Sequence, residues 1–131
     1  MTPIRILDGL PYVPAVLVIN GITLKFEKML LDTGSGGTLF STETLENVGV
    51  FIELTDVIAQ VTGIGGVETV AEKLADSVQV GDLIAAPFTI EVGKLYKKFD
   101  FEGIIGLDFL LHTGAVIDFT ALEIRKALPH T

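Results

Sequence analysis

The chain has 131 residues, a length that suits one domain with its own core, and we expect a single domain over residues 1–131. Apolar residues make up 49% and charged residues 20%, a balance that excludes an intrinsically disordered chain. The net charge of −8 disfavours nucleic acid as a partner, and the absence of cysteine excludes disulfides, thiolate metal sites and cysteine nucleophiles.

Neither a membrane segment nor a metal site is predicted. The uncharged segment 9–24 contains two prolines and an Asn-Gly turn and is too short to span a bilayer. No basic region followed by an unbroken apolar stretch begins the chain, so we expect a cytoplasmic protein without a signal peptide. His112 and His130 lie far apart with no carboxylates paired to them in the sequence, and we expect no metal and no cofactor.

The first half of the chain begins with a predicted hairpin. Residues 13–19 and 22–31 are two β-type runs, and Asn20-Gly21 between them suits a two-residue turn whose central positions need positive φ. Apolar and polar residues alternate along 22–27, which predicts one buried and one solvent-facing side. Residues 29–31 then form an apolar run that leads directly into Asp32.

The remaining elements are short and mostly extended. Val70, Leu74 and Val78 recur at a spacing that fits a helix as well as a strand, so segment 70–78 stays open between the two. The other predictions are a helix at 41–48 between Ser41 and Gly49, strands at 57–62, 67–80 and 83–92, a helix at 107–112, and strands at 115–119 and 122–126. The pattern predicts a mainly β fold with one or two short helices, closer to a small closed barrel than to a doubly wound sheet.

Residues 30–38 carry the chemistry. An apolar strand delivers the Asp32 carboxylate into a loop of very small residues, Thr33-Gly34-Ser35-Gly36-Gly37-Thr38. Small side chains let a second backbone or a substrate come close, while hydroxyl and N–H donors can hold a carboxylate in place, as acid–base catalysis requires. The alternative is an ordinary turn that begins at an aspartate, because these residue types are common turn formers.

Three segments, in order, resemble one known family. Leu30-Leu31-Asp32-Thr33-Gly34-Ser35 is similar to the active-site signature of the aspartic peptidases. Segment 62–67 resembles the glycine-rich tip of the retropepsin flap, the hairpin that closes over substrate. Segment 103–110 resembles the family's second hydrophobic-hydrophobic-Gly element and the helix that follows it. The resemblance covers residues 13–126. Residues 106–110 and 115–119 most resemble bacterial single-domain relatives of the retroviral proteases.

The resemblance implies a closed β-barrel of the retropepsin type, an aspartic endopeptidase activity and a peptide or protein substrate. It also implies that Asp32 is the catalytic residue. The active-site loop would be supported by Thr33, Gly34 and Ser35, with Ser35 within reach of the carboxylates. A mobile lid that binds substrate would consist of Thr62, Gly63, Ile64, Gly65 and Gly66, and the site would be supported by Ile105 and Gly106.

The implied mechanism needs two carboxylates, and the chain has one Asp-Thr-Gly. The other aspartates lack the small-residue loop, and Asp108 and Asp118 are interpreted as anchors of backbone turns. The simplest solution is a two-fold homodimer that places Asp32 of each copy side by side. In the viral enzymes an acidic residue after the catalytic triplet pairs with an arginine just after the later glycine. Here Ser35, Gly36 and Gly37 follow the triplet and Leu107 follows Gly106, so this ion pair is absent.

Two other classes of function stay open. A retropepsin-like dimer could keep the fold but only bind peptides or a partner protein, because fold alone does not imply activity. A small-ligand barrel is the weaker alternative, since it has no need of a glycine-rich lid. The Asp32 motif and the lid together favour the enzyme.

Overall fold

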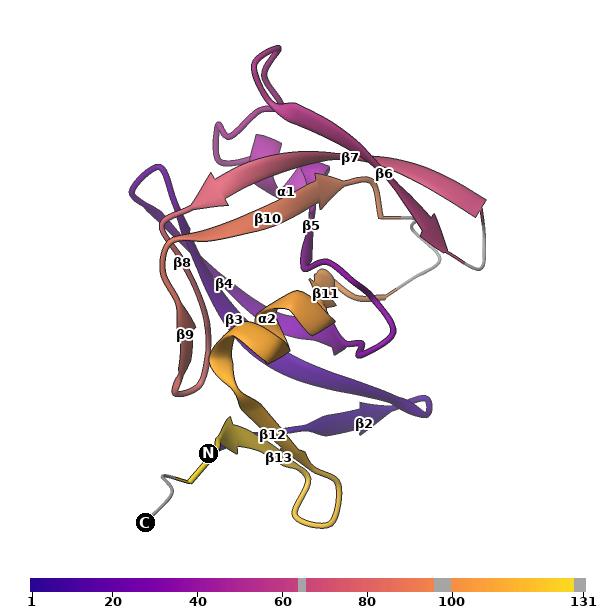
Figure 1. The fold of residues 1–131 in the computed structure, drawn as a ribbon, viewed down its shortest axis with the longest axis vertical. Helices are drawn as coiled ribbons and strands as arrows, with labels where there is room; N and C mark the ends of the chain where they lie inside the picture. Colours follow the sequence, from indigo (N-terminus) through magenta and orange to yellow (C-terminus); the bar gives the residue numbers. More distant parts are fainter. Residues whose placement is uncertain (64–65, 96–99, 129–131) are drawn as a thin grey trace.

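The computed structural model describes residues 1–63, 66–95 and 100–128, and it is mainly β, as predicted (Figure 1). The larger of two sheets has ten strands. These are β2 (Arg5–Leu7), β3 (Leu10–Ile19), β4 (Ile22–Leu31), β5 (Leu39–Ser41), β6 (Val57–Gly63), β7 (Gly66–Ala75), β8 (Ser77–Val80), β9 (Leu83–Ala85), β10 (Phe88–Gly93) and β11 (Gly103–Ile105). Their order is β6-β7-β10-β5-β11-β4-β3-β8-β9, with β2 on β3. Within the described residues this path is not found to close, so the closed barrel stays a prediction.

The predicted hairpin is confirmed and lies within the large sheet, between β11 and β8. β3 and β4 pair antiparallel around Asn20 and Gly21, which have φ of 51° and 75°. That left-handed backbone is the geometry for which Asn-Gly is favoured. The Gly21 N–H also donates to Asp76 Oδ2 at 3.0 Å, so the turn is tied to the junction between β7 and β8. Along β4, Phe26 is buried and its neighbours on both sides are exposed, as the alternation predicts.

The open segment 70–78 is extended, but the predicted single strand at 67–80 was wrong, because the chain bends at Asp76 between β7 and β8. β7 pairs with β6 on one side and with β10 on the other, so its backbone groups are satisfied by two neighbouring strands. Val70 and Leu74 would share a face in a strand as well as in a helix, so the pairing decides: Val70 lies opposite Ala59 of β6, and Leu74 lies opposite Thr89 of β10. Sheet pairing therefore decides a segment whose local pattern fits both structures.

The predicted run at 83–92 is two strands, so this boundary was wrong. β9 ends at Ala85 and pairs with β8, whereas β10 begins at Phe88 and pairs with β7 and β5. Pro87 lies between them, and a proline has no N–H to donate to a strand ladder. The chain uses this break to pass from one part of the large sheet to another.

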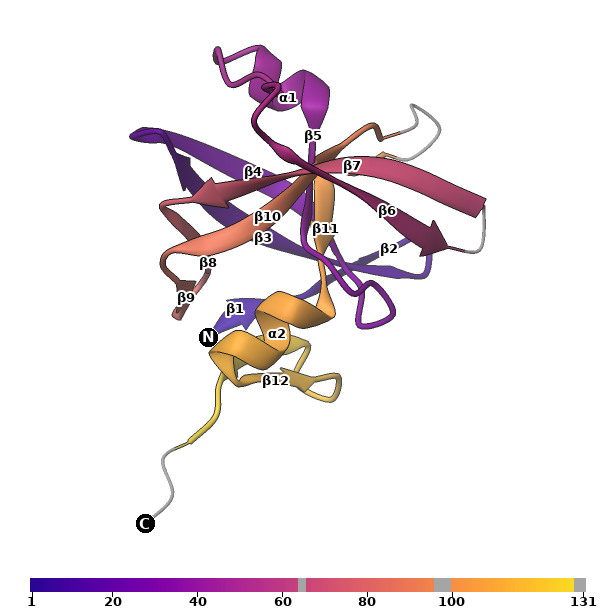
Figure 2. The ribbon, with the colours of Figure 1, turned by 45° about the horizontal axis from the view of Figure 1, so that its top comes forward.

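The smaller sheet brings segments from both ends of the described chain together. It consists of β1 (Thr2–Pro3), β13 (Glu123–Lys126) and β12 (Ala115–Asp118), in that order. The described residues also form two short helices, α1 (Thr42–Glu46) and α2 (Leu107–Thr113). They lie on opposite sides of the large sheet in the view of Figure 2. No described helix is long and apolar enough to cross a bilayer.

One hydrophobic core joins the hairpin, the short strands and α2. Its fully buried side chains include Val13 and Leu17 of β3, Met29 of β4, Phe40 of β5, Ile90 of β10, Ile105 of β11 and Phe109 of α2. Burial of side chains of this size contributes about 1.5–3 kcal/mol each. The core thus fixes the ends of β4, β5 and β11, the three strands from which the candidate site is built.

Candidate active site

Asp32 is the first residue after β4, at the point where that strand runs beside β11. The two strands are parallel, with Leu31 opposite Ile105. The Asp32 N–H continues the ladder by donating to the Ile105 carbonyl oxygen at 3.0 Å. Because Leu31 and Ile105 are both buried, core packing fixes where the chain leaves the sheet. The half-buried Asp32 side chain is thereby held at the edge of the core.

A tight turn orients the Asp32 carboxylate. Its Oδ1 accepts a hydrogen bond from the Gly34 N–H at 2.9 Å, and its carbonyl oxygen accepts one from the Ser35 N–H at 3.2 Å. A Cβ on Gly34 would lie 3.2 Å from Oδ1, which is a crowded contact. Thr33 and Gly34 are exposed. The carboxylate is therefore fixed from its own loop, while the outer side of that loop remains open to a ligand or a second chain.

The loop after Asp32 crosses the chain at Gly106 in direct backbone contact. A Cβ on Gly106 would lie 2.2 Å from the Gly37 carbonyl oxygen and 2.9 Å from that of Ser35. The Leu107 N–H donates to the Ser35 carbonyl oxygen at 2.7 Å. The Ser35 hydroxyl, expected within reach of the carboxylates, donates to the Gly37 carbonyl oxygen at 2.8 Å. Ser35 thus braces the backbone of the loop.

Thr38 and Asp108 hold this crossing together, although no role was predicted for Thr38. Thr38 is fully buried, and both its hydroxyl and its N–H donate to the Asp108 carboxylate. Asp108 also accepts from the N–H of Phe109. The interpretation of Asp108 as a backbone anchor is confirmed. The position of Thr38 at the end of the glycine loop was the one sequence feature that could have indicated this role. Its partner lies 70 residues away in the chain, so the sequence did not show what Thr38 binds.

Asp32 lines a cleft of about 640 Å³. The active-site loop forms one wall, the hairpin of β6 and β7 forms another, and the end of β10 closes the third side. Its lining residues are Asp32, Gly34, Ser35, Gly36, Leu39, Val61, Glu68, Thr69, Val70, Glu91, Lys94 and Ile104. The arrangement places the Asp32 carboxylate beside apolar side chains, with further polar and acidic groups around it, and pockets that bind small molecules or peptides combine such groups.

The predicted lid falls on the β6–β7 hairpin. Thr62 and Gly63 end β6 and Gly66 begins β7, with Thr62 opposite Val67 and Gly63 opposite Gly66. Ile64 and Gly65 lie outside the described residues. Val61, Glu68, Thr69 and Val70 of the same hairpin line the cleft that contains Asp32. The segment predicted to cover a substrate is therefore part of a hairpin that borders the cleft.

Sequence reasoning missed Glu91, a half-buried residue of β10 in the cleft wall. Burial and the negative charges of Asp108 and Glu72 raise the pKa of its carboxyl above the ordinary 4.5. The signal was present in the alternation of Ile90-Glu91-Val92. Ile90 and Val92 are buried in the core, so Glu91 points to the other side of the strand, and that side is the cleft.

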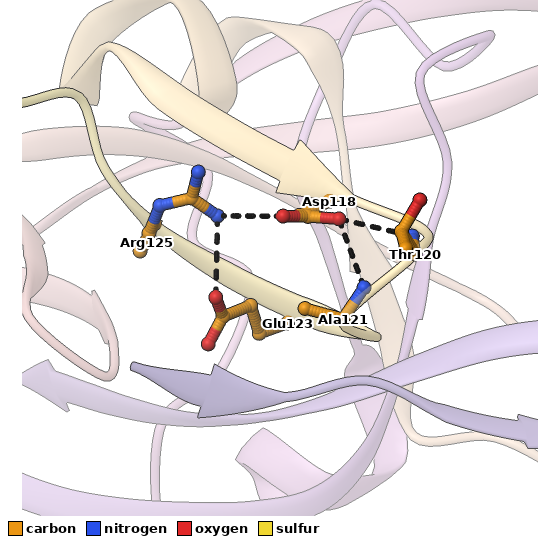
Figure 3. Close-up of polar contacts among 5 residues, drawn as sticks. All are labelled: Asp118, Thr120, Ala121, Glu123 and Arg125. Carbon is orange, nitrogen blue, oxygen red and sulfur yellow. Dashed lines mark hydrogen bonds and ion pairs between the residues drawn. The ribbon is translucent and has the colours of Figure 1, made fainter.

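Other polar residues singled out in the sequence are structural. Asp118 Oδ1 accepts hydrogen bonds from the N–H groups of Thr120 and Ala121 at 2.9 Å, and its Oδ2 lies 3.4 Å from Arg125 Nη1 (Figure 3). These donors and the Arg125 charge lower the pKa of Asp118. The cluster closes the turn between β12 and β13, so Asp118 is confirmed as a turn anchor. His112 lies in the last turn of α2 and packs on Phe88.

Comparison with known proteins agrees with this geometry. No curated protein matches the chain at a significant level. A model of the aspartyl protease family, in contrast, matches residues 15–109. The matched region runs from β3 to α2 and so includes Asp32, the β6–β7 hairpin and the crossing at Gly106. This chain of 131 residues belongs to the aspartyl protease family.

Proposed function

We propose that this protein is an aspartic endopeptidase whose active site forms across a homodimer, with Asp32 of each copy as the catalytic pair. The observation that carries the proposal is the placement of the Asp32 carboxylate. The Gly34 N–H holds it at 2.9 Å, and it faces a cleft of about 640 Å³ that is large enough for several side chains of a peptide.

The chemistry needs a second carboxylate, which supports the dimer. Aspartic proteases are the usual example of two carboxyl groups about 3 Å apart that share one proton, because both cannot ionise at once. In the proposed step, the ionised Asp32 takes a proton from water, and the resulting hydroxide adds to the scissile carbonyl carbon. The protonated Asp32 of the other copy gives its proton to the carbonyl oxygen. On collapse the C–N bond breaks, the Asp32 that took the proton from water passes it to the leaving amine, and a hydroxyl of the intermediate returns a proton to the other Asp32.

The surroundings of Asp32 favour this assembly. The Thr33 and Gly34 side of the loop is exposed, so a second copy can approach it without unfolding either subunit. Thr33, Gly34 and Ser35 shape the loop, and Ile105 and Gly106 support it from behind. Residues 62–66 serve as the lid over bound peptide, and the large sheet closes into the small barrel that the retropepsin resemblance implies.

A peptide-library digestion from pH 3 to 8 tests the proposal, with wild type compared with Asp32→Asn. Asparagine keeps the shape of the side chain but cannot act as a base, so cleavage should be lost while the dimer stays folded. Asp82→Asn is the matched control, because Asp82 is exposed in the turn between β8 and β9 and does not line the cleft.

Each outcome bears on one alternative. Equal cleavage by wild type and Asp32→Asn would remove Asp32 from the mechanism. Peptide binding without cleavage by wild type would support instead a catalytically silent, peptide-binding dimer. Among active variants, the pH profile should be bell-shaped, because only the singly protonated pair is competent and its two apparent pKa values belong to the pair.

A further inference from the structure

Glu91 occupies a central place in the cleft wall. In β10 it lies opposite Leu39 of β5 on one side and opposite Glu72 of β7 on the other. Its backbone N–H donates to the Thr38 carbonyl oxygen at 2.8 Å, which fixes the strand against the end of the active-site loop. The side chain is thus presented from a rigid sheet position. Two residues further along the same face of β10, the apolar lining residues Leu39 and Val70 meet over Gly93, where an added Cβ would lie 3.1 Å and 3.0 Å from them.

The Glu91 carboxylate extends over the active-site loop. A Cβ placed on Gly37 would lie 2.3 Å from Glu91 Oε1 and 2.5 Å from Oε2, so the carboxylate fills the space above that glycine. Within the part of the chain that the structure describes, no hydrogen bond or ion pair joins this carboxylate to another group. Carboxylates removed from water are ordinarily paired with a cation or several donors. Glu91 is a partly desolvated acid that lacks such a protein partner among these residues.

The electrostatic surroundings of Glu91 favour a cation at this place. Asp108 and Glu72 both add negative potential to it. Asp32 lines the same cleft as Glu91. A cationic group near Glu91 would therefore gain from Glu91 itself, from its acidic neighbours Asp108 and Glu72, and from the Asp32 carboxylate.

We propose that Glu91 is a specificity-determining residue, which selects peptides that carry a lysine or arginine side chain in the part of the cleft between Leu39 and Val70. The apolar stem of either side chain would pack on Leu39 and Val70, while its charged end reaches the Glu91 carboxylate. Arginine can do so with two parallel hydrogen bonds. This inference rests on the proposed function, because it describes the substrate of the same site.

The two-fold dimer extends the proposal to both sides of the scissile bond. Each copy contributes one Glu91, and the two-fold axis relates them across the pair of Asp32 residues. A peptide bound across the site should therefore be recognised at two positions, one on each side of the bond that is cut, with a basic side chain favoured at both.

The experiment uses two matched peptide series that differ only in lysine, arginine, norleucine or glutamine at the varied position. The readout is the ratio of kcat/KM for the basic peptide to that for the norleucine peptide. Wild type should prefer the basic peptide, and Glu91→Gln should lower the ratio roughly ten- to a hundredfold, the range for loss of a hydrogen bond to a charged group. Glu91→Asp should restore part of it. Glu72→Gln removes a neighbouring charge without changing the cleft lining, and should lower the preference much less than Glu91→Gln does.

The same peptides are also titrated onto Asp32→Asn, with and without Glu91→Gln, so that binding is measured separately from cleavage. If wild type cleaves peptides with no basic preference, or Glu91→Gln keeps that preference, this inference is overturned while the proposed activity stands. A preference for glutamine over lysine would overturn it too, since Glu91 would then act as a neutral acid. If nothing is cleaved, the proposed activity fails and the titration tests the inference by itself. A weaker affinity for the basic peptides after Glu91→Gln supports the inference. Equal affinity for these peptides with and without Glu91→Gln overturns it.

Discussion

The Thr38 hydroxyl donates a hydrogen bond to Asp108 Oδ1 at 2.8 Å and accepts one from the Gly106 N–H at 3.1 Å. This fully buried hydroxyl therefore links the loop that contains Asp32 to the start of α2. Two segments about 70 residues apart in the chain are joined at the point where the candidate active site is built. The position of Asp32 depends on this link as well as on its own turn.

Replacing Thr38 with valine tests the link. The substitution keeps the shape of the side chain but leaves the buried Gly106 N–H without its acceptor and removes one of the hydrogen bonds to Asp108, which keeps those from the Thr38 and Phe109 N–H groups. An unsatisfied buried group costs about 1–3 kcal/mol. We expect a comparable loss in the free energy of unfolding, measured by denaturant titration, and lower peptidase activity. Thr38→Ser is the matched control, because it keeps the hydroxyl and should lose less stability. Equal losses in both variants would show that the methyl group matters and the hydroxyl does not.

The backbone crossing at Gly106 predicts a strong effect from one added methyl group. In Gly106→Ala, the new Cβ would meet the Gly37 carbonyl, a backbone group that cannot rotate away. Overpacking of this kind costs about 1–3 kcal/mol, so the melting temperature should fall clearly. Gly36→Ala is the control for stability, since its Cβ would have no atom within 4 Å. A Gly106→Ala protein as stable as Gly36→Ala would contradict the observed packing.

Activity should depend on protein concentration. Each copy holds one Asp32, so a monomer has half of the proposed site, and specific activity should fall on dilution through the dimer dissociation constant. Activity and sedimentation velocity measured over the same concentration range should show the same midpoint. Full activity in a sample shown to be monomeric would contradict the two-fold arrangement.

The raised pKa of Glu91 predicts how stability varies with pH. A carboxyl whose pKa is higher in the folded state binds its proton more tightly there than in the unfolded chain. Its contribution to stability is present at low pH and is lost as the pH rises above the ordinary value of 4.5 and through the folded pKa. Glu91→Gln should thus be more stable than wild type near neutral pH, and the difference should shrink below about pH 4.5.

Melting temperatures of the two proteins between pH 3 and 8 measure this effect. Glu72→Gln is the informative partner, because it removes one of the charges that raise the Glu91 pKa. It should also gain stability near neutral pH. A constant difference between Glu91→Gln and wild type at every pH would argue against titration of Glu91 in this window.

Much of the fold and the centre of the site could be predicted from local patterns. Asn20-Gly21 specifies a hairpin because its backbone angles suit few other residues, and the alternation along β4 specifies which side is buried. The Asp32 motif, the β6–β7 hairpin and the Gly106 element follow in an order that identified the family before any geometry was known. Each of these signals lies within a few consecutive residues, where sequence directly constrains the backbone.

What only the tertiary structure decided depends on partners that are distant in the chain. Segment 70–78 became extended because β7 pairs with β6 and β10, and β8 pairs with β3 and β9, although the local pattern also fits a helix. Thr38 acquired a role because Asp108 lies beside it, and Glu91 because the outer side of β10 is a cleft wall. A sequence records which side of a strand a residue occupies, but what covers that side is set by how the strands pack together.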